Sequence, residues 1–121
     1  MVPPSQKTAA RVPQAIVLAK VNTSATFSCE SQDGVLWNLC FWQQKSQGQQ
    51  QLVMVDQAVA ASGGRTLVDG ISYVGDVINN DGKCAIKIGF VTERDFGQWS
   101  CTLVCQTGQV FNGEVEVHNG M

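Results

Sequence analysis

Apolar and polar residues alternate along much of this chain, in short runs that glycine and serine separate. The alternation is clearest in residues 25–29 (ATFSC), 84–88 (CAIKI), 99–103 (WSCTL) and 114–117 (EVEV). A period of two is that of a β-strand with one buried face, and strands at regular spacing are typical of a sandwich or a barrel. The segment QAVAASGG is the best candidate for a helical turn, and its own glycines end it. We therefore expect an all-β fold.

The length of the chain sets the number of domains. With 121 residues, it can bury one ordinary core and has no room for a second. We expect one domain over residues 1–121, in which about residues 1–13 form a flexible N-terminal segment or a first strand. The opening MVPPSQKTAA lacks the apolar segment of a signal peptide. We expect that any natural signal was removed and that the chain is a fragment of a longer protein.

Five cysteines in so short a chain indicate an oxidising, extracellular compartment, at a cell surface or after secretion. The odd number leaves at least one thiol that is free or paired between chains. No two cysteines have the C-x-x-C spacing of a zinc site, and the only histidine, His118, lies in the C-terminal tail. We therefore expect neither a metal site nor a cofactor.

Charge and motif content exclude several functional classes. The formal net charge is −2 and no basic stripe is present, so we expect no binding to nucleic acid. The apolar runs are too short to span a bilayer, so we expect no membrane insertion by this segment. No serine or cysteine has a nearby base in a catalytic arrangement, so we do not expect an enzyme.

Three residues narrow the all-β prediction to one architecture. Cys29, Trp42 and Cys101 follow one another in the order found in immunoglobulin domains, where the tryptophan packs on a disulfide between the sheets. The segment DFGQWSC, which ends at Cys101, resembles the D-x-G-x-Y-x-C element of these domains, with Trp99 in place of the tyrosine. The resemblance implies a two-sheet Greek-key sandwich, a Cys29–Cys101 bridge, and Trp42 and Trp99 in its core. An indole donates a hydrogen bond but accepts none, so we expect a differently built corner at Trp99.

The resemblance is specifically to the variable set. WQQKSQGQQQLVMV is similar to the segment that leads from strand C to strand C′, and residues 56–81 have room for strands C″ and D. Phe111 stands where the joining-type F-G-x-G motif has its phenylalanine, but Asn112 and Glu114 replace the glycines, which argues against the usual bulge in strand G. The arginine that often pairs with the aspartate before strand F is missing. Asp95 is left with Arg65, Lys87 or no partner.

The other three cysteines allow two pairings. In variable domains the positions of Cys40 and Cys84 hold apolar side chains that touch, which implies a second bridge between the sheets. The rival pairing is Cys40–Cys105, across neighbouring strands. The extra pair resembles invertebrate immunoglobulin domains of arthropods and lower chordates, as does Trp99. With Cys40–Cys84 formed, Cys105 is either a buried free thiol or a link to another chain or loop.

On this fold, binding takes place in the loops at one end or on the outer face of the sheet G-F-C-C′. The predicted binding face is made up of Phe41, Gln43, Val53, Val104 and Phe111, with Val110 as the alternative to Phe111. An exposed apolar patch rimmed by amides is typical of a protein interface. Trp37, before strand C, is either a loop contact or a plug that folds back on the core.

Asn22-Thr23-Ser24 is a sequon for N-glycosylation, placed before the strand that ends at Cys29. A glycan there would leave the other sheet free for binding.

Two functional hypotheses remain. The first is a recognition or adhesion domain of a cell-surface protein, similar to junctional adhesion molecules or ancestral antigen receptors. It would bind a protein partner, with homophilic dimerisation as one form, through the sheet face. The second is a soluble innate-immune module that binds microbial or other ligands through its loops.

Overall fold

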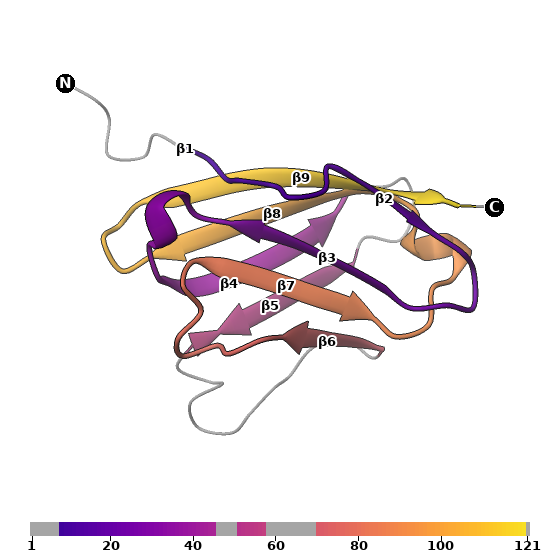
Figure 1. Cartoon of the computed structure of the whole chain (residues 1–121), viewed down its shortest axis with the longest axis horizontal. Coiled ribbons are helices and arrows are strands. Elements are labelled where there is room, and N and C mark those ends of the chain that lie inside the picture. The colour runs from indigo at the N-terminus through magenta and orange to yellow at the C-terminus, as the bar shows by residue number, and fades with distance from the viewer. Residues whose placement is uncertain (1–7, 46–50, 58–69, 121) are drawn as a thin grey trace.

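The computed structural model describes residues 8–45, 51–57 and 70–120, and these residues form a sandwich of two β-sheets (Figure 1). The strands of the described residues are β1 (Thr8–Ala9), β2 (Ile16–Ala19), β3 (Ala25–Glu30), β4 (Trp37–Gln44), β5 (Leu52–Asp56), β6 (Ile71–Val74), β7 (Lys83–Ile88), β8 (Gly97–Cys105) and β9 (Val110–Asn119). Two short 3-10 turns, η1 (Gln32–Gly34) and η2 (Glu93–Asp95), connect the sheets. The all-β prediction is confirmed.

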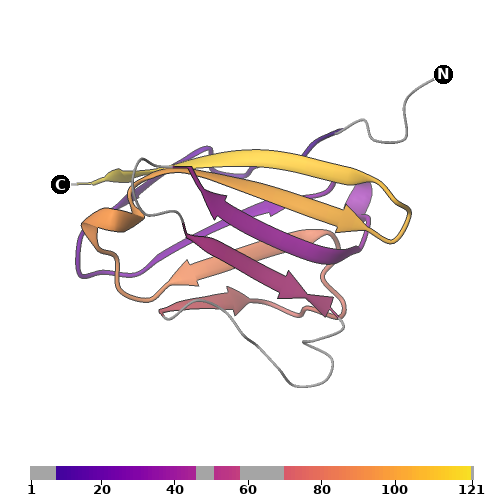
Figure 2. The same cartoon turned by 180° about the vertical axis from the view of Figure 1, so that it is seen from behind.

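The strands divide between a larger and a smaller sheet. The larger, six-stranded sheet has the order β1-β9-β8-β4-β5, with β2 also paired to β9, and the three-stranded sheet has the order β3-β7-β6. The chain passes from one sheet to the other between β2 and β3, between β3 and β4, between β5 and β6 and between β7 and β8, while β4–β5, β6–β7 and β8–β9 are antiparallel neighbours. Figure 1 views the molecule from the side of β3, β7 and β6, and Figure 2 views it from the side of β4 and β5.

The N-terminal part of the described chain pairs with strands of both sheets. Residues 8–9 and 16–19 pair in parallel with β9, whereas Arg11 between them forms a bridge with Glu30 of β3. Gly113 makes this crossing possible, because a Cβ there would lie 2.8 Å from a methyl carbon of Val12 and 3.2 Å from the Cβ of Ala10. The glycine therefore serves close packing of the N-terminal segment against β9. Residues 1–7 of the predicted N-terminal segment lie outside the described residues.

Two disulfides join the sheets across the core. Cys29 of β3 is bonded to Cys101 of β8, and Cys40 of β4 is bonded to Cys84 of β7, each with a Cα–Cα distance of 6.6 Å. Cys29 and Cys84 lie directly opposite each other in the three-stranded sheet, so the two bridges are neighbours. The structure therefore contains the Cys40–Cys84 pairing and not the Cys40–Cys105 alternative. Structural disulfides of this kind fit an extracellular or secreted domain.

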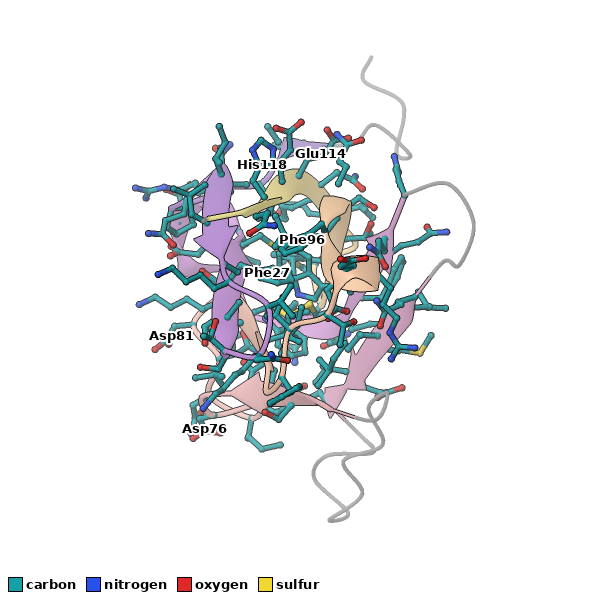
Figure 3. The ribbon with its side chains drawn as sticks, turned by 90° about the vertical axis from the view of Figure 1, so that its right-hand side faces the viewer. Phe27, Asp76, Asp81, Phe96, Glu114 and His118 are labelled. Carbon is teal, nitrogen blue, oxygen red and sulfur yellow. A yellow bond between two sulfur atoms is a disulfide. The ribbon has the colours of Figure 1, made fainter. Side chains whose placement is uncertain are left out.

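Aromatic side chains fill the space beside the bridges. Trp42 and Trp99 are completely buried, and both pack against Phe27, with ring centroids 5.1 and 5.5 Å apart respectively. Trp42 lies opposite Cys101 on the neighbouring strand, as the Cys-Trp-Cys order predicts. Figure 3 shows Phe27 and Phe96 between the sheets, whereas Glu114 and His118 lie on the outside along β9. The core thus lies between the sheets around Phe27.

The architecture is compatible with an immunoglobulin-like domain. It has two facing sheets, a disulfide that links them and a tryptophan beside that disulfide. The eight residue pairs between β8 and β9 keep one register from Gly97–Val117 to Val104–Val110, so Asn112 and Glu114 lie in a regular ladder. Among the described residues, no helix has the length and apolar character that a membrane crossing requires.

Candidate functional site

The outer face of β9, β8, β4 and β5 is the most prominent surface for binding, and it faces the viewer in Figure 2. Cross-strand pairing arranges its side chains in three rows. They run Glu114–Ser100–Gln43–Leu52, Asn112–Thr102–Phe41–Met54 and Val110–Val104–Leu39–Asp56. Directly paired residues point to the same side of a sheet, so each row forms a continuous strip across the four strands. We call these three rows the sheet face.

Phe41 lies in the middle row, at the centre of the sheet face. It is half-buried, and its cross-strand neighbours are Thr102 on one side and Met54 on the other. The N-terminal residues Ala9 and Ala10 and the outward side chains of β4, β8 and β9, including Phe41, line an open hollow of about 870 Å³. The apolar centre of the sheet face therefore borders a depression.

Two residues of the predicted binding face belong to the core instead. Val53 is completely buried, because it pairs with the inward-facing Trp42, and Phe111 is buried, because it pairs with the inward-facing Leu103. The prediction that they are exposed on the binding face was wrong. Val110 takes the place of Phe111 on the outer side of β9.

The sheet face also includes apolar residues that the sequence analysis missed. Leu52 and Met54 on β5 are 51% and 48% exposed, and Leu39 on β4 is half-buried. Residues 52–55 read LVMV and are apolar at every position, so their pattern does not show which side faces water. Only the pairing of Phe41 with Met54 decides it. The predicted Phe41, Gln43 and Val104 do lie on the sheet face, where Leu52 and Met54 replace Val53.

Polar and charged groups border the apolar centre. The Nζ of Lys45 lies 3.9 Å from a carboxylate oxygen of Glu114, and the amide of Gln98 donates to the same carboxylate. Thr102 donates through Oγ1 to Oδ1 of Asn112 at 3.0 Å, while the buried Nδ2 of Asn112 has no hydrogen-bond partner in the described part of the chain. Lys45 and Glu114 are each about half exposed, so their ion pair contributes little to stability and leaves both charges available to a partner.

Trp37 is a core residue, and its alternative role as a loop contact was wrong. It is the first residue of β4 and is completely buried, with its indole packed edge-on against Tyr73 at 6.0 Å. Its Nε1 donates to the backbone oxygen of Lys83 at 2.8 Å, and so does the hydroxyl of Tyr73 at 3.1 Å. Burial, followed by the charge of Asp76, raises the pKa of Tyr73 to about 12.

Asn80 holds the same region together, and sequence reasoning did not find it. Its side chain is buried between the β6–β7 turn and the start of β4. Oδ1 accepts from the backbone N–H groups of Trp37 and Gly82, while Nδ2 donates to the backbone oxygens of Trp37 and Val77. One amide therefore satisfies four backbone groups. No local pattern signals this role, because Trp37 and Asn80 are 43 residues apart.

Trp99 donates a hydrogen bond through its indole N–H. Its Nε1 bonds the backbone oxygen of Asp95, four residues earlier, at 3.0 Å. The buried carboxylate of Asp95 accepts from the backbone and hydroxyl of Thr92 and from Nε2 of Gln51 at 2.9 Å. Gln51 also donates to the buried Gln44. Of the two basic candidates for Asp95, Lys87 forms no ion pair with it in the described residues, and Arg65 lies outside them.

Cys105 is buried at the end of β8 and is the free cysteine of the chain. Burial raises the pKa of its thiol, which disfavours the reactive thiolate. It therefore behaves as a small core residue in the monomer and is not positioned as an exposed link to another chain.

We expect the native chain to resist alkylation at Cys105. Iodoacetamide reacts with thiolates, so at neutral pH the folded protein should incorporate almost no label, whereas denaturant without reductant should expose one thiol per chain. Mass spectrometry of unreduced peptides should place this label on Cys105. Rapid labelling of the native protein, or label on Cys84 with Cys40 bonded to Cys105, would contradict the structure.

Comparison with known protein families finds no family model that matches the chain, and comparison with curated proteins finds no similar sequence. The described residues contain no group of three or more His, Cys, Asp or Glu side chains placed to hold a metal ion. The chain is an all-β sandwich with two disulfides, compatible with an immunoglobulin-like domain, and its sheet face carries apolar and amide side chains and an open hollow.

Proposed function

We propose that the chain is a variable-type immunoglobulin domain of an extracellular recognition or adhesion protein, and that it binds a protein partner through the sheet face. The observation that carries this proposal is the row Asn112–Thr102–Phe41–Met54, in which a half-buried phenylalanine and an exposed methionine stand beside hydroxyl and amide groups. Protein interfaces have this composition, with aromatic and methionine side chains at the centre and polar groups around them. In variable-domain terms, the face belongs to strands G, F, C and C′.

The charges on the face favour a second copy of this domain as the partner. In an interface with two-fold symmetry the same patch meets itself, so each residue of one copy can face a different residue of the other. The face carries a cation, Lys45, and an anion, Glu114, both about half exposed. Two copies can therefore place Lys45 of each against Glu114 of the other, beside the two-fold axis.

The described loops at one end of the sandwich offer less to a partner. The exposed residues of η1 are Gln32, Asp33 and Gly34, and those of the β8–β9 turn are Gln106, Thr107, Gly108 and Gln109. None of these has an aromatic or large apolar side chain, and Trp37, the aromatic residue closest to η1 in the sequence, is buried. The β6–β7 turn, which is bonded to the residues around η1, adds one large apolar side chain, Ile78, which is 44% exposed. Interface hot spots are enriched in aromatic residues, so we favour the sheet face over loop-mediated recognition.

Self-association tests the proposal directly. Light scattering coupled to size exclusion should show a concentration-dependent dimer for the unaltered chain. Phe41→Glu and Met54→Glu should each weaken it by about 2 kcal/mol or more, roughly thirtyfold in Kd, because a charge is buried without a partner. The matched control is Val74→Glu on β6, which adds the same charge at an exposed apolar position (42%) of the other sheet and should leave the dimer intact.

Thermal melting of each variant separates loss of the interface from loss of the fold. A strict monomer at high concentration would contradict homophilic binding. Binding of microbial or other ligands that survives Phe41→Glu would instead support recognition through the loops.

A further inference from the structure

The sequon Asn22-Thr23-Ser24 lies in a tight turn between β2 and β3. Asn22, Thr23 and Ser24 are all exposed, and Thr23 donates through Oγ1 to the backbone oxygen of Lys20 at 2.7 Å. Asn22 has a φ of 73°, a left-handed conformation that asparagine tolerates better than most residues. The turn therefore presents the side-chain amide of Asn22 on the surface.

The segment that follows β7 is bound to this turn. The backbone N–H of Asn22 donates to the oxygen of Val91 at 2.9 Å, and the N–H of Val91 donates to the oxygen of Thr23 at 2.8 Å. Val91 is completely buried, whereas the preceding residue, Phe90, is 62% exposed. Two backbone hydrogen bonds thus attach Val91 to the sequon, and the exposed Phe90 is the residue next to Val91 in the chain.

Phe90 is the most exposed aromatic side chain of the described residues, and Val21, next to Asn22, adds a 37% exposed apolar side chain. Both side chains leave apolar surface exposed to solvent. Exposed aromatic rings at a fixed position are surfaces for another group, and the apolar side of a sugar ring packs well on an aromatic ring. The sequon and this apolar surface are independent features that meet at the same turn.

We infer that Asn22 carries an N-linked glycan whose first N-acetylglucosamine packs against Phe90 and Val21. The glycan thereby becomes part of the folded domain, because it covers apolar surface that the polypeptide leaves in water. This inference goes beyond the proposed function and concerns a different surface. The β2–β3 turn lies at the end of the sandwich beside η2, opposite the end with η1 and the β8–β9 turn (Figure 1).

The test begins with the chain secreted from eukaryotic cells. Intact mass and glycopeptide mapping should show a glycan on Asn22, and Ser24→Ala should remove it. Ser24→Ala is preferred to a substitution of Asn22 because it leaves the left-handed residue in place. The glycosylated chain should melt about 4 °C above the Ser24→Ala chain. Trimming with an endoglycosidase that leaves one N-acetylglucosamine should preserve most of this difference.

Phe90→Ala provides the decisive comparison. In the Phe90→Ala background, the difference in Tm between the chain with Ser24 and the chain with Ser24→Ala should fall to about 1 °C or less. An unmodified Asn22 would overturn the inference, and so would an equal glycan-dependent shift with and without Phe90. Phe41→Glu should leave the shift unchanged, so failure of this inference is distinguishable from failure of the sheet-face proposal.

Discussion

Replacing Cys29 and Cys101 together by alanine is expected to lower the free energy of unfolding by about 4 kcal/mol. The bridge joins residues 72 apart, and the chain-entropy estimate for a loop of that length is about 4 kcal/mol. Typical domains are stable by about 5–15 kcal/mol, so the variant should be close to unfolding at body temperature. Urea denaturation followed by tryptophan fluorescence measures the loss.

The matched control is Cys105→Ala, because it makes the same substitution at a buried cysteine that has no bridge. It should cost only about 1 kcal/mol, the price of a small cavity. Removing the Cys40–Cys84 bridge, which spans 44 residues, should cost somewhat less than removing Cys29–Cys101. If the Cys29 and Cys101 variant lost no more stability than Cys105→Ala, the bridge would not constrain the unfolded chain.

Asn80→Leu is expected to cost about 3–5 kcal/mol. Leucine has a similar size but can form none of the hydrogen bonds of Asn80, so four backbone groups of Trp37, Val77 and Gly82 would lose that partner. A buried backbone group without a partner costs about 1–3 kcal/mol. The same urea experiment should show a lower midpoint with an unchanged slope.

Asn79→Leu is the control. The side chain of Asn79 is exposed, and the hydrogen bond of Asn79 to Asp76 is donated by its backbone N–H, which leucine also has. It should change stability by about 0.5 kcal/mol or less. Asn80→Asp should cost at least as much as Asn80→Leu at neutral pH, because it buries a carboxylate and turns one of its oxygens toward the backbone oxygens of Trp37 and Val77. Equal losses for Asn79→Leu and Asn80→Leu would show that Asn80 does not hold the turn.

Much of the sheet face was accessible from the sequence. Trp42 marks the inner side of β4, so Phe41 and Gln43 on either side of it must face outward. Cys101 does the same for β8 and places Val104 on the outer side. Each of these predictions needed only a strand and one residue in it, Trp42 or Cys101, that is known to point into the core.

The two errors have different origins. In residues 52–55 every position is apolar, so the pattern does not show which side is buried. On β9 the alternation of Val115 and Val117 with glutamates marks the inner side, and Phe111, four residues before Val115, belongs to that side. A shift of one residue turns every side chain of a strand to the other face. The pairings Trp42–Val53 and Leu103–Phe111 decide the direction, and they belong to neighbouring strands.

The sequence by itself determined the all-β class and the positions of β3, β7, β8 and β9. Strand formation with one buried face leaves a local trace, an alternation of period two. Only the tertiary structure decided that Trp37 is buried, that Asn80 satisfies its backbone, and that Gly113 makes room for the N-terminal segment. It also decided that Val91, the residue after Phe90, is hydrogen-bonded to the turn that holds the sequon. Each of these depends on contacts between residues far apart in the chain, and such contacts leave no periodic signal in the sequence.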